Sequence, residues 1–336
     1  MGIFKSLKGK VDVGTSNATD SHPAYTDSKE VYSPPAGPPP SHTQNAQSGF
    51  QPPPGPPPSA NPPPYHDWTV IPDTALLPPP PAFPQEYSST NNATYQSAEA
   101  GHAWCDRNPV FTPSVPNQTL RDAVARGNMG IQRPDTLAKN AELKQTSAGI
   151  WHVKTKKGQT DAMLLSTLPL YFAAVDSPLK TGKEYSVYFE LKVLGIRDGE
   201  SGIAIGYAAK PCPLWRLPGW HRASVGVHGD DGRRFVNDSW GGRDFVAKFE
   251  VGDVVGLGMK FETEERGGEK VKTRVSFTRN GREEGGWEAD EERDAERDEG
   301  IEGLQGELDM YPAVGVFGGI EAEIRLRRED WLYQSS

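Results

Sequence analysis

The chain has 336 residues, 31 of them proline, and a formal net charge of −9 at pH 7. Residues 283–307 alone carry −10, so the remaining residues sum to +1, and no basic stripe indicates a nucleic-acid partner. The two cysteines, Cys105 and Cys212, have no metal-ligand or disulfide-framework spacing, which favours a reducing compartment and excludes a disulfide-rich secreted fold.

The first ten residues, MGIFKSLKGK, form a distinct head without the apolar region of a secretory signal. Met1 to Ser6 fits the N-myristoylation pattern, which makes Gly2 the candidate lipidation site. One acyl chain binds membranes only marginally, and the nearby Lys5, Lys8 and Lys10 would add attraction to an anionic leaflet. The alternative stays open, because many unmodified proteins also begin with Met-Gly. The longest uncharged run, residues 162–175, is too short to span a membrane and is read as core strands.

Twenty prolines fall between Ser33 and Pro84. Such a stretch cannot form helices or central strands and favours the extended polyproline II conformation. We therefore expect residues 1–100 to be a disordered proline-rich arm. Pro62, Pro63, Pro64 and Tyr65 form a PPxY motif within it, the kind of ligand that WW domains bind in an aromatic groove. A chance match in so proline-rich a segment is the alternative.

Residues 101–149 are expected to be an extension that packs on a C-terminal domain. Within it, residues 119–126 (TLRDAVAR) predict a short helix, with Thr119 as its cap and Gly127 at its end.

From residue 150 onward the hydrophobic pattern has the period of β-strands. Val187, Phe189, Leu191 and Val193 alternate with polar residues, and residues 203–207 repeat the alternation. Further strands are predicted at residues 254–261, 271–278, 311–317 and 320–326, and Asn280-Gly281 is a hairpin signal. Many short strands without intervening helices predict an all-β antiparallel sandwich over residues 150–336.

The acidic segment, residues 283–307, interrupts this pattern. Its self-repelling charge predicts a solvated loop insertion.

Five ordered segments resemble the SPRY domain, closest to SPRY domains of the Ran-binding-protein type and of fungal endosomal adaptors. These are residues 215–221 (WRLPGWH), 224–234 (SVGVHGDDGRR), 251–258 (VGDVVGLG), 276–281 (SFTRNG) and 311–316 (YPAVGV). The resemblance covers residues 185–326 and extends more weakly to residue 150. It implies a SPRY-type β-sandwich that binds a protein or peptide through loops at one edge.

By that analogy Trp220 and Phe317 would line the partner-binding surface, with Arg216 and His221 as secondary contacts. Trp220 lies in a loop whose proline and glycine exclude regular structure. The alternative is that Trp220 belongs to the core beneath a long loop, and residue types alone do not decide between the two.

A PPxY motif beside a SPRY domain resembles fungal adaptors that recruit WW-bearing HECT ubiquitin ligases to cargo. This resemblance implies a non-enzymatic trafficking adaptor, cytoplasmic and peripheral on endosomal or vacuolar membranes where acylated. One alternative is a SPRY scaffold unconnected to ubiquitin, whose arm binds SH3-type readers. No catalytic residue set, metal cluster or phosphate-binding loop is recognisable, so we expect neither an enzyme nor a cofactor.

Overall fold

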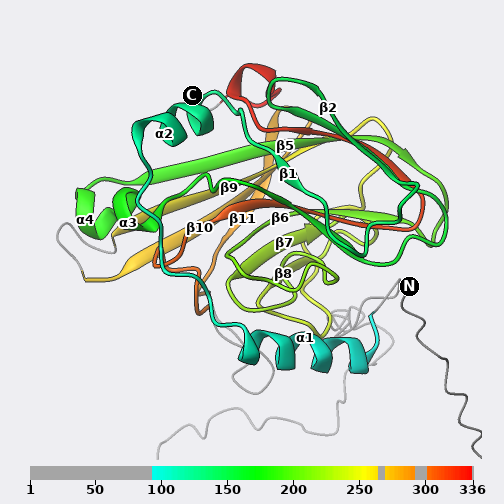
Figure 1. Ribbon diagram of the computed structural model, residues 1–336, viewed down its shortest axis with the longest axis horizontal. Coiled ribbons are helices and arrows are strands. Elements are labelled where there is room, and N and C mark those ends of the chain that lie inside the picture. Colours follow the sequence, from blue (N-terminus) through cyan, green and yellow to red (C-terminus); the bar gives the residue numbers. More distant parts are fainter. Residues whose placement is uncertain (1–92, 264–268, 292–300, 335–336) are drawn as a thin grey trace, which may run out of the picture. The chain divides into compact units, whose positions relative to one another are not determined.

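A computed structural model describes residues 93–263, 269–291 and 301–334. They form two antiparallel sheets that pack face to face (Figure 1). The first sheet has the order β1 (Ile131–Gln132), β4 (Ala162–Ser166), β12 (Tyr311–Phe317), β6 (Gly202–Ala208), β7 (Ser224–His228) and β8 (Arg234–Val236). The second has the order β11 (Arg282–Glu288), β10 (Val271–Arg279), β9 (Val254–Thr263), β5 (Tyr185–Ile196), β13 (Ile320–Arg325), β3 (Ile150–Lys154) and β2 (Glu142–Ser147).

The core lies between the inner faces of the two sheets. The alternating residues predicted on β5 are buried there, and Phe189 meets Tyr207 of β6 edge to face at 5.3 Å. The Tyr207 hydroxyl donates to the Leu257 carbonyl of β9 at 3.0 Å, which satisfies its polar end inside the core. The antiparallel β-sandwich predicted from the strand pattern is thus confirmed.

Strand β6 departs from the alternation predicted for it. All seven of its residues are buried, so it has no solvent-exposed face. The sequence pattern could not show this, because the second face is covered by the loop that follows the strand.

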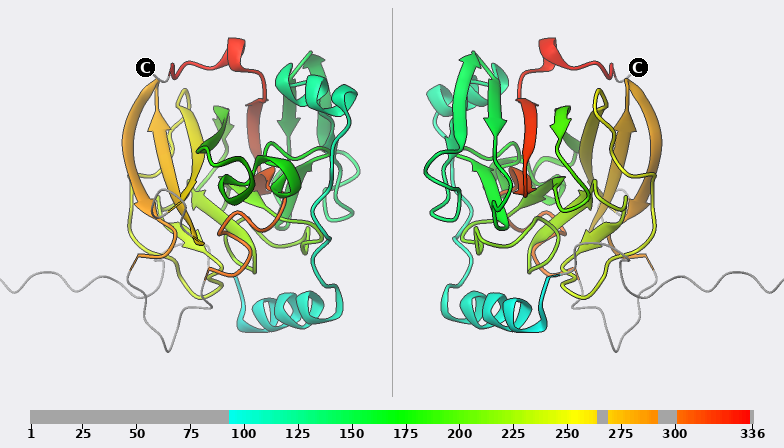
Figure 2. Two further views of the ribbon diagram at one scale, coloured as in Figure 1. Left: turned by 90° about the vertical axis from the view of Figure 1, so that its left-hand side faces the viewer. Right: turned by 90° about the vertical axis from the view of Figure 1, so that its right-hand side faces the viewer.

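Within the described residues four α-helices accompany the sheets, α1 (Tyr95–Arg107), α2 (Gln118–Ala125), α3 (Ala173–Asp176) and α4 (Pro178–Thr181), together with one 3-10 turn at Arg328–Asp330. Helix α2 matches the predicted helix, but its cap is Asn117, whose Oδ1 accepts from the Leu120 N–H at 2.9 Å. Helix α1 begins before the boundary at residue 100, so the expectation of a disordered arm to that residue is wrong at its C-terminal end. Residues 1–92 lie outside the described residues. Figures 1 and 2 place α1 and α2 at opposite ends of the sandwich.

The predicted hairpin joins β10 to β11. Asn280 and Gly281 have φ values of 51° and 78°, as a type I′ turn requires. The chain then continues as β11. The prediction of a loop insertion from residue 283 is therefore wrong for residues 283–288, which form a strand. Trp287 and Leu304, within the predicted insertion, are buried in the core. These two apolar residues therefore pack both ends of the acidic segment against the sandwich.

No helix in the described ranges is long and apolar enough to span a membrane. The uncharged run from residue 162 contains β4, as predicted, but ends in α3.

Candidate functional site

The loop of residues 209–223 crosses the outer face of the first sheet. Gly206 of β6 and Gly226 of β7 let it approach closely, since a Cβ on either would lie within 2.6 Å of a Pro218 atom. His228 forms a 3.0 Å hydrogen bond with the Pro218 carbonyl through Nε2. This close packing buries the second face of β6.

Arg216 is completely buried at the centre of this loop. Its Nε donates to His221 Nε2 at 2.9 Å, and its guanidinium carbon lies 4.1 Å from the centre of the Trp220 ring. Its Nη1 donates to Ser97 Oγ of α1 at 2.8 Å, while Nη2 has no hydrogen-bond partner within the described residues.

Burial governs the protonation of this pair. It lowers the pKa of Arg216 to about 10, opposed by the carboxylate of Asp161. Burial also lowers the pKa of His221 to about 3, and the nearby Arg216 charge acts in the same direction. His221 is therefore a neutral imidazole at pH 7 that accepts the hydrogen bond from Arg216.

Helix α1 lies over these loop residues. Its buried positions are the small residues Ala98, Gly101 and Cys105, which let the helix come close. Thr94 caps the first turn through its side chain, which accepts from the Ser97 N–H at 3.2 Å. At the other end, Arg222 donates to the carbonyls of Cys105 and Asn108, as a cation at a helix C-terminus does.

The four residues predicted to bind a partner are brought together, but three of them do not face solvent. Trp220 is 5% exposed and packs with Leu217 and Phe235, with Phe317 against the same cluster. Arg216 and His221 are buried beneath α1, and Phe317 alone is half-buried at the rim. In this arrangement Arg216, Trp220 and His221 hold α1 on the domain, which favours the core alternative for Trp220.

A pocket of about 340 Å³ opens beside the C-terminal end of α1. Trp104 of α1 and Trp215 of the loop meet edge to face at 5.7 Å and form part of its wall with Phe111, which is 62% exposed. Leu165, Cys212 and Leu214 supply apolar lining. Sequence reasoning did not assign this site, because its two tryptophans are far apart in the chain.

The polar residues around this pocket include three that only donate hydrogen bonds, Trp104, Lys210 and Trp215, beside Gln132, Asp135 and Thr136, which carry acceptor oxygens. Lys210 Nζ donates to the Ser166 carbonyl at 2.9 Å and lies 4.3 Å from the centre of the Tyr311 ring, with no carboxylate partner in the described ranges. Burial lowers the pKa of Lys210. Within the same ranges the indole N–H groups of Trp104 and Trp215 have no acceptor, and Asp135 is the one carboxylate in the lining.

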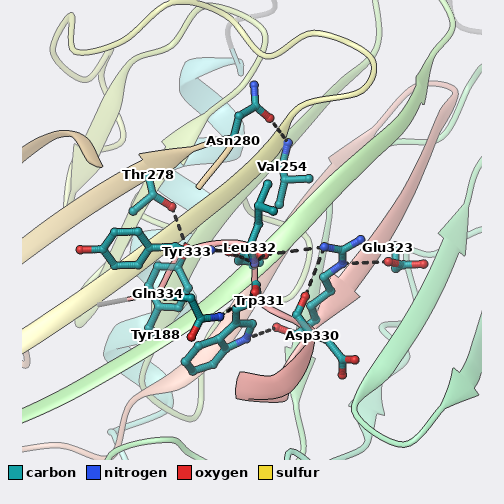
Figure 3. Close-up of polar contacts among 12 residues, drawn as sticks. Tyr188, Val254, Thr278, Asn280, Glu323, Asp330, Trp331, Leu332, Tyr333 and Gln334 are labelled. Carbon is teal, nitrogen blue, oxygen red and sulfur yellow. Dashed lines mark hydrogen bonds and ion pairs between the residues drawn. The ribbon is translucent and has the colours of Figure 1, made fainter. Parts of the chain in front are cut away.

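A second hollow, of about 480 Å³, lies on the outer face of the second sheet. Figure 3 shows Tyr188 of β5 close to Trp331 and Tyr333 of the C-terminal segment. The buried carboxylate of Glu190 accepts the backbone N–H groups of Leu332 and Tyr333 at 2.8 Å and so fixes this segment. Three cations line this hollow, and two of them, Lys260 and Arg274, are already paired with carboxylates; the third is Arg328.

No group of three metal-ligating side chains occurs within residues 93–263, 269–291 and 301–334. His228, adjacent in sequence to Asp230 and Asp231, stacks on Phe235 at 4.0 Å and is buried. Its role is therefore to fill the space beneath the loop.

Residues 186–296 match the SPRY domain family. The chain contains a SPRY domain. Because the match begins within β5, helices α1 and α2 and the first four strands lie outside it, although the structure packs them onto the same sandwich. The SPRY domain is a protein-binding module, and the pocket beside α1 is formed by matched and unmatched residues together.

The curated relatives are similar over short segments. A SPRY domain-containing protein of Schizosaccharomyces pombe is 37% identical over 95 residues, 28% of this chain and 22% of the relative. Protein ssh4 of Sclerotinia sclerotiorum is 27% identical over 155 residues, 46% of this chain and 25% of the relative. Ran-binding protein 9 of Danio rerio is 44% identical over 70 residues, 20% of this chain and 11% of the relative. This chain thus matches a quarter or less of each of these relatives.

Two solved SPRY domains are also similar. A human SPRY domain has a TM-score of 0.37 at 22% identity, covering 55% of this chain and 97% of that one. The SPRY domain of human HERC1 has a TM-score of 0.33 at 15% identity, covering 56% of this chain and 94% of that one.

Proposed function

We propose that this protein is a non-enzymatic adaptor that binds a partner protein through the pocket beside α1. The observation that carries the proposal is the preformed cavity of about 340 Å³ with Trp104, Trp215 and Phe111 in its wall. Aromatic side chains in such pockets supply most of the binding energy at protein interfaces. The SPRY domain then presents a site that is already open to one apolar side chain of a partner.

The second part of the proposal concerns recruitment. The PPxY motif of Pro62, Pro63 and Tyr65 recruits a WW-domain HECT ubiquitin ligase to the bound partner. The motif lies outside the described residues, and its sequence supports this role. Acylation of Gly2, also outside them, would hold the cytoplasmic adaptor peripherally on endosomal or vacuolar membranes.

Affinity enrichment of the full chain, with quantification of the recovered proteins, tests partner binding and ligase recruitment in one experiment. Tyr65→Ala should lose the ligase and retain the pocket's partner, whereas Trp215→Ala should lose the partner and retain the ligase. Val115→Ala is the matched control, because Val115 is 75% exposed and does not line the pocket. It should retain both.

The contrary outcomes separate the alternatives. Retention of the ligase by Tyr65→Ala would contradict the role of the PPxY motif, whereas recovery of SH3 proteins in place of the ligase would replace the ubiquitin connection with the scaffold alternative. A peptide of residues 59–69 gives the direct measurement. It should bind an isolated ligase WW domain with a Kd of about 1 μM, near −8 kcal/mol, and its Tyr65→Ala form should bind far more weakly.

A further inference from the structure

The pocket beside α1 is complementary to proline-rich peptide. Its lining includes Trp104 and Trp215, whose indole N–H groups have no acceptor among the described residues, and Lys210, whose Nζ donates to the Ser166 carbonyl and lies over the Tyr311 ring. A proline residue has a carbonyl acceptor, no backbone N–H and a flat apolar ring. Aromatic grooves bind such segments because the polyproline II conformation loses little entropy on binding. Donors and aromatic rings around one cavity therefore match proline in both respects.

This chain carries such a segment shortly before α1 in the sequence. Residues 78–84 read PPPPAFP, and Glu86 is the one charged residue between residue 78 and the first described residue, Ala93. Lys210 is the one cation in the pocket lining, and it has no carboxylate partner among the described residues. The lining also holds the carboxylate of Asp135, so the charge match is local: Glu86 is complementary to Lys210 and not to the pocket as a whole.

The chain is also long enough to reach the pocket. Trp104 lies ten residues beyond the cap Thr94, a distance of about 15 Å along the helix axis. The seven residues between Glu86 and Thr94 can span about 23 Å when extended. A tether this short gives a local concentration in the millimolar range, so the segment would be the first proline-rich ligand to meet the pocket.

We propose that residues 78–86 of this chain dock in the pocket of Trp104, Phe111 and Trp215, with Glu86 paired to Lys210. The docked segment occludes the pocket, and a partner must displace it to bind. This inference rests on the proposed function, since it concerns access to the same site.

A synthetic peptide of residues 78–88, added to the full chain, measures the occlusion. A chain with Pro78, Pro79, Pro80 and Pro81 replaced by serine should bind the peptide at least about tenfold more tightly than wild type, because self-competition is removed. Adding Trp215→Ala to that chain should abolish binding. Equal affinity for the wild-type and serine-substituted chains, or no binding to either, would overturn the proposal.

Charge reversal tests the position of Glu86. In the serine-substituted chain, Lys210→Glu should weaken peptide binding, and a peptide with Glu86→Lys should restore it. The restored binding itself would show that the variant folds, whereas absence of rescue would contradict the ion pair. The affinity enrichment with Trp215→Ala, which tests the proposed function, is a separate experiment that does not use this peptide. If Trp215→Ala loses the partner but the serine-substituted chain does not bind the peptide, this inference is wrong and the proposed function stands.

Discussion

The backbone of Gly101 in α1 lies directly against the imidazole ring of His221. A Cβ at position 101 would lie 2.3 Å from His221 Nε2, closer than carbon and nitrogen can approach. The helix is therefore fitted to the loop of residues 209–223, and the walls of the pocket come from both. Helix α1 thus packs on the same sandwich as the residues that match the SPRY family, although the family match does not include it.

Gly101→Ala tests this fit, because helix propensity and the contact with His221 predict opposite changes in the free energy of unfolding. Alanine in a helix interior is favoured over glycine by about 1 kcal/mol, so a free helix would gain stability. We expect a net loss instead, since the added Cβ must push α1 off His221. Chemical denaturation measures the change. Ala100→Gly in the same helix is the control, because Ala100 is exposed and its loss should follow helix propensity alone. A stabilised Gly101→Ala chain would contradict the contact.

Trp220→Ala should lower the free energy of unfolding by about 3–5 kcal/mol, as truncation of a buried tryptophan does. The same change at Trp240 should cost less than about 2 kcal/mol, because this ring is half-buried and meets Tyr95 at the surface. Thermal or chemical unfolding of the two variants gives the comparison. An unchanged melting temperature for Trp220→Ala would return this residue to the candidate partner contacts.

Stability should fall on acidification, in part through His221. Its pKa is about 3 when folded and about 6.5 when unfolded, so the stabilisation is complete above pH 6.5 and is lost as the pH falls toward 3. Between pH 7 and pH 5 this one group should cost about 2 kcal/mol. Asp161 acts in the opposite direction, because burial raises its pKa to about 6.

The variant His221→Gln isolates this contribution. Glutamine can still accept the hydrogen bond from Arg216 but does not titrate. The loss of stability between pH 7 and pH 5 should therefore be smaller in the variant by about 2 kcal/mol. Parallel pH profiles for variant and wild type would show that His221 is not buried as a neutral group.

Glu190→Ala should release the C-terminal segment from the second sheet. It leaves the N–H groups of Leu332 and Tyr333 without an acceptor and removes the carboxylate 3.8 Å from Arg325, at a cost of about 1–3 kcal/mol. Amide hydrogen exchange should become faster at these two residues. Glu323→Ala, which also loses a contact with Arg325, is the control and should leave their exchange unchanged. Unaltered exchange in Glu190→Ala would contradict the role of Glu190 in holding the C-terminal segment on the second sheet.

The sandwich could be predicted from sequence because its strands carry a period of two and its hairpin carries Asn280-Gly281. Helix α1 could not, because its buried face is built from Ala98, Gly101 and Cys105. These residues have helical spacing but too little apolar surface to register as an amphipathic pattern. Strand β11 was hidden for a related reason, since its carboxylates outweigh the single buried Trp287.

The candidate site was predicted only in part. Sequence reasoning pointed to the loop of residues 215–221, and the structure places both Trp215 and Trp220 in it, but partner binding by this loop stays a prediction. Which of them is exposed depends on α1, and no local pattern links that helix to the loop. Trp220 therefore belongs to the interior, whereas Trp215 and Trp104 meet at the pocket.

The indole N–H signals of the full chain in a two-dimensional NMR spectrum test the central claim most directly. Trp104→Phe and Trp215→Phe assign the two pocket signals, and Trp331→Phe assigns the signal from the hollow on the second sheet. Addition of the partner recovered with wild type should shift the signals of Trp104 and Trp215 and leave that of Trp331 in place. A shift confined to Trp331, with both pocket signals unchanged, would place the binding surface on the second sheet and contradict the account.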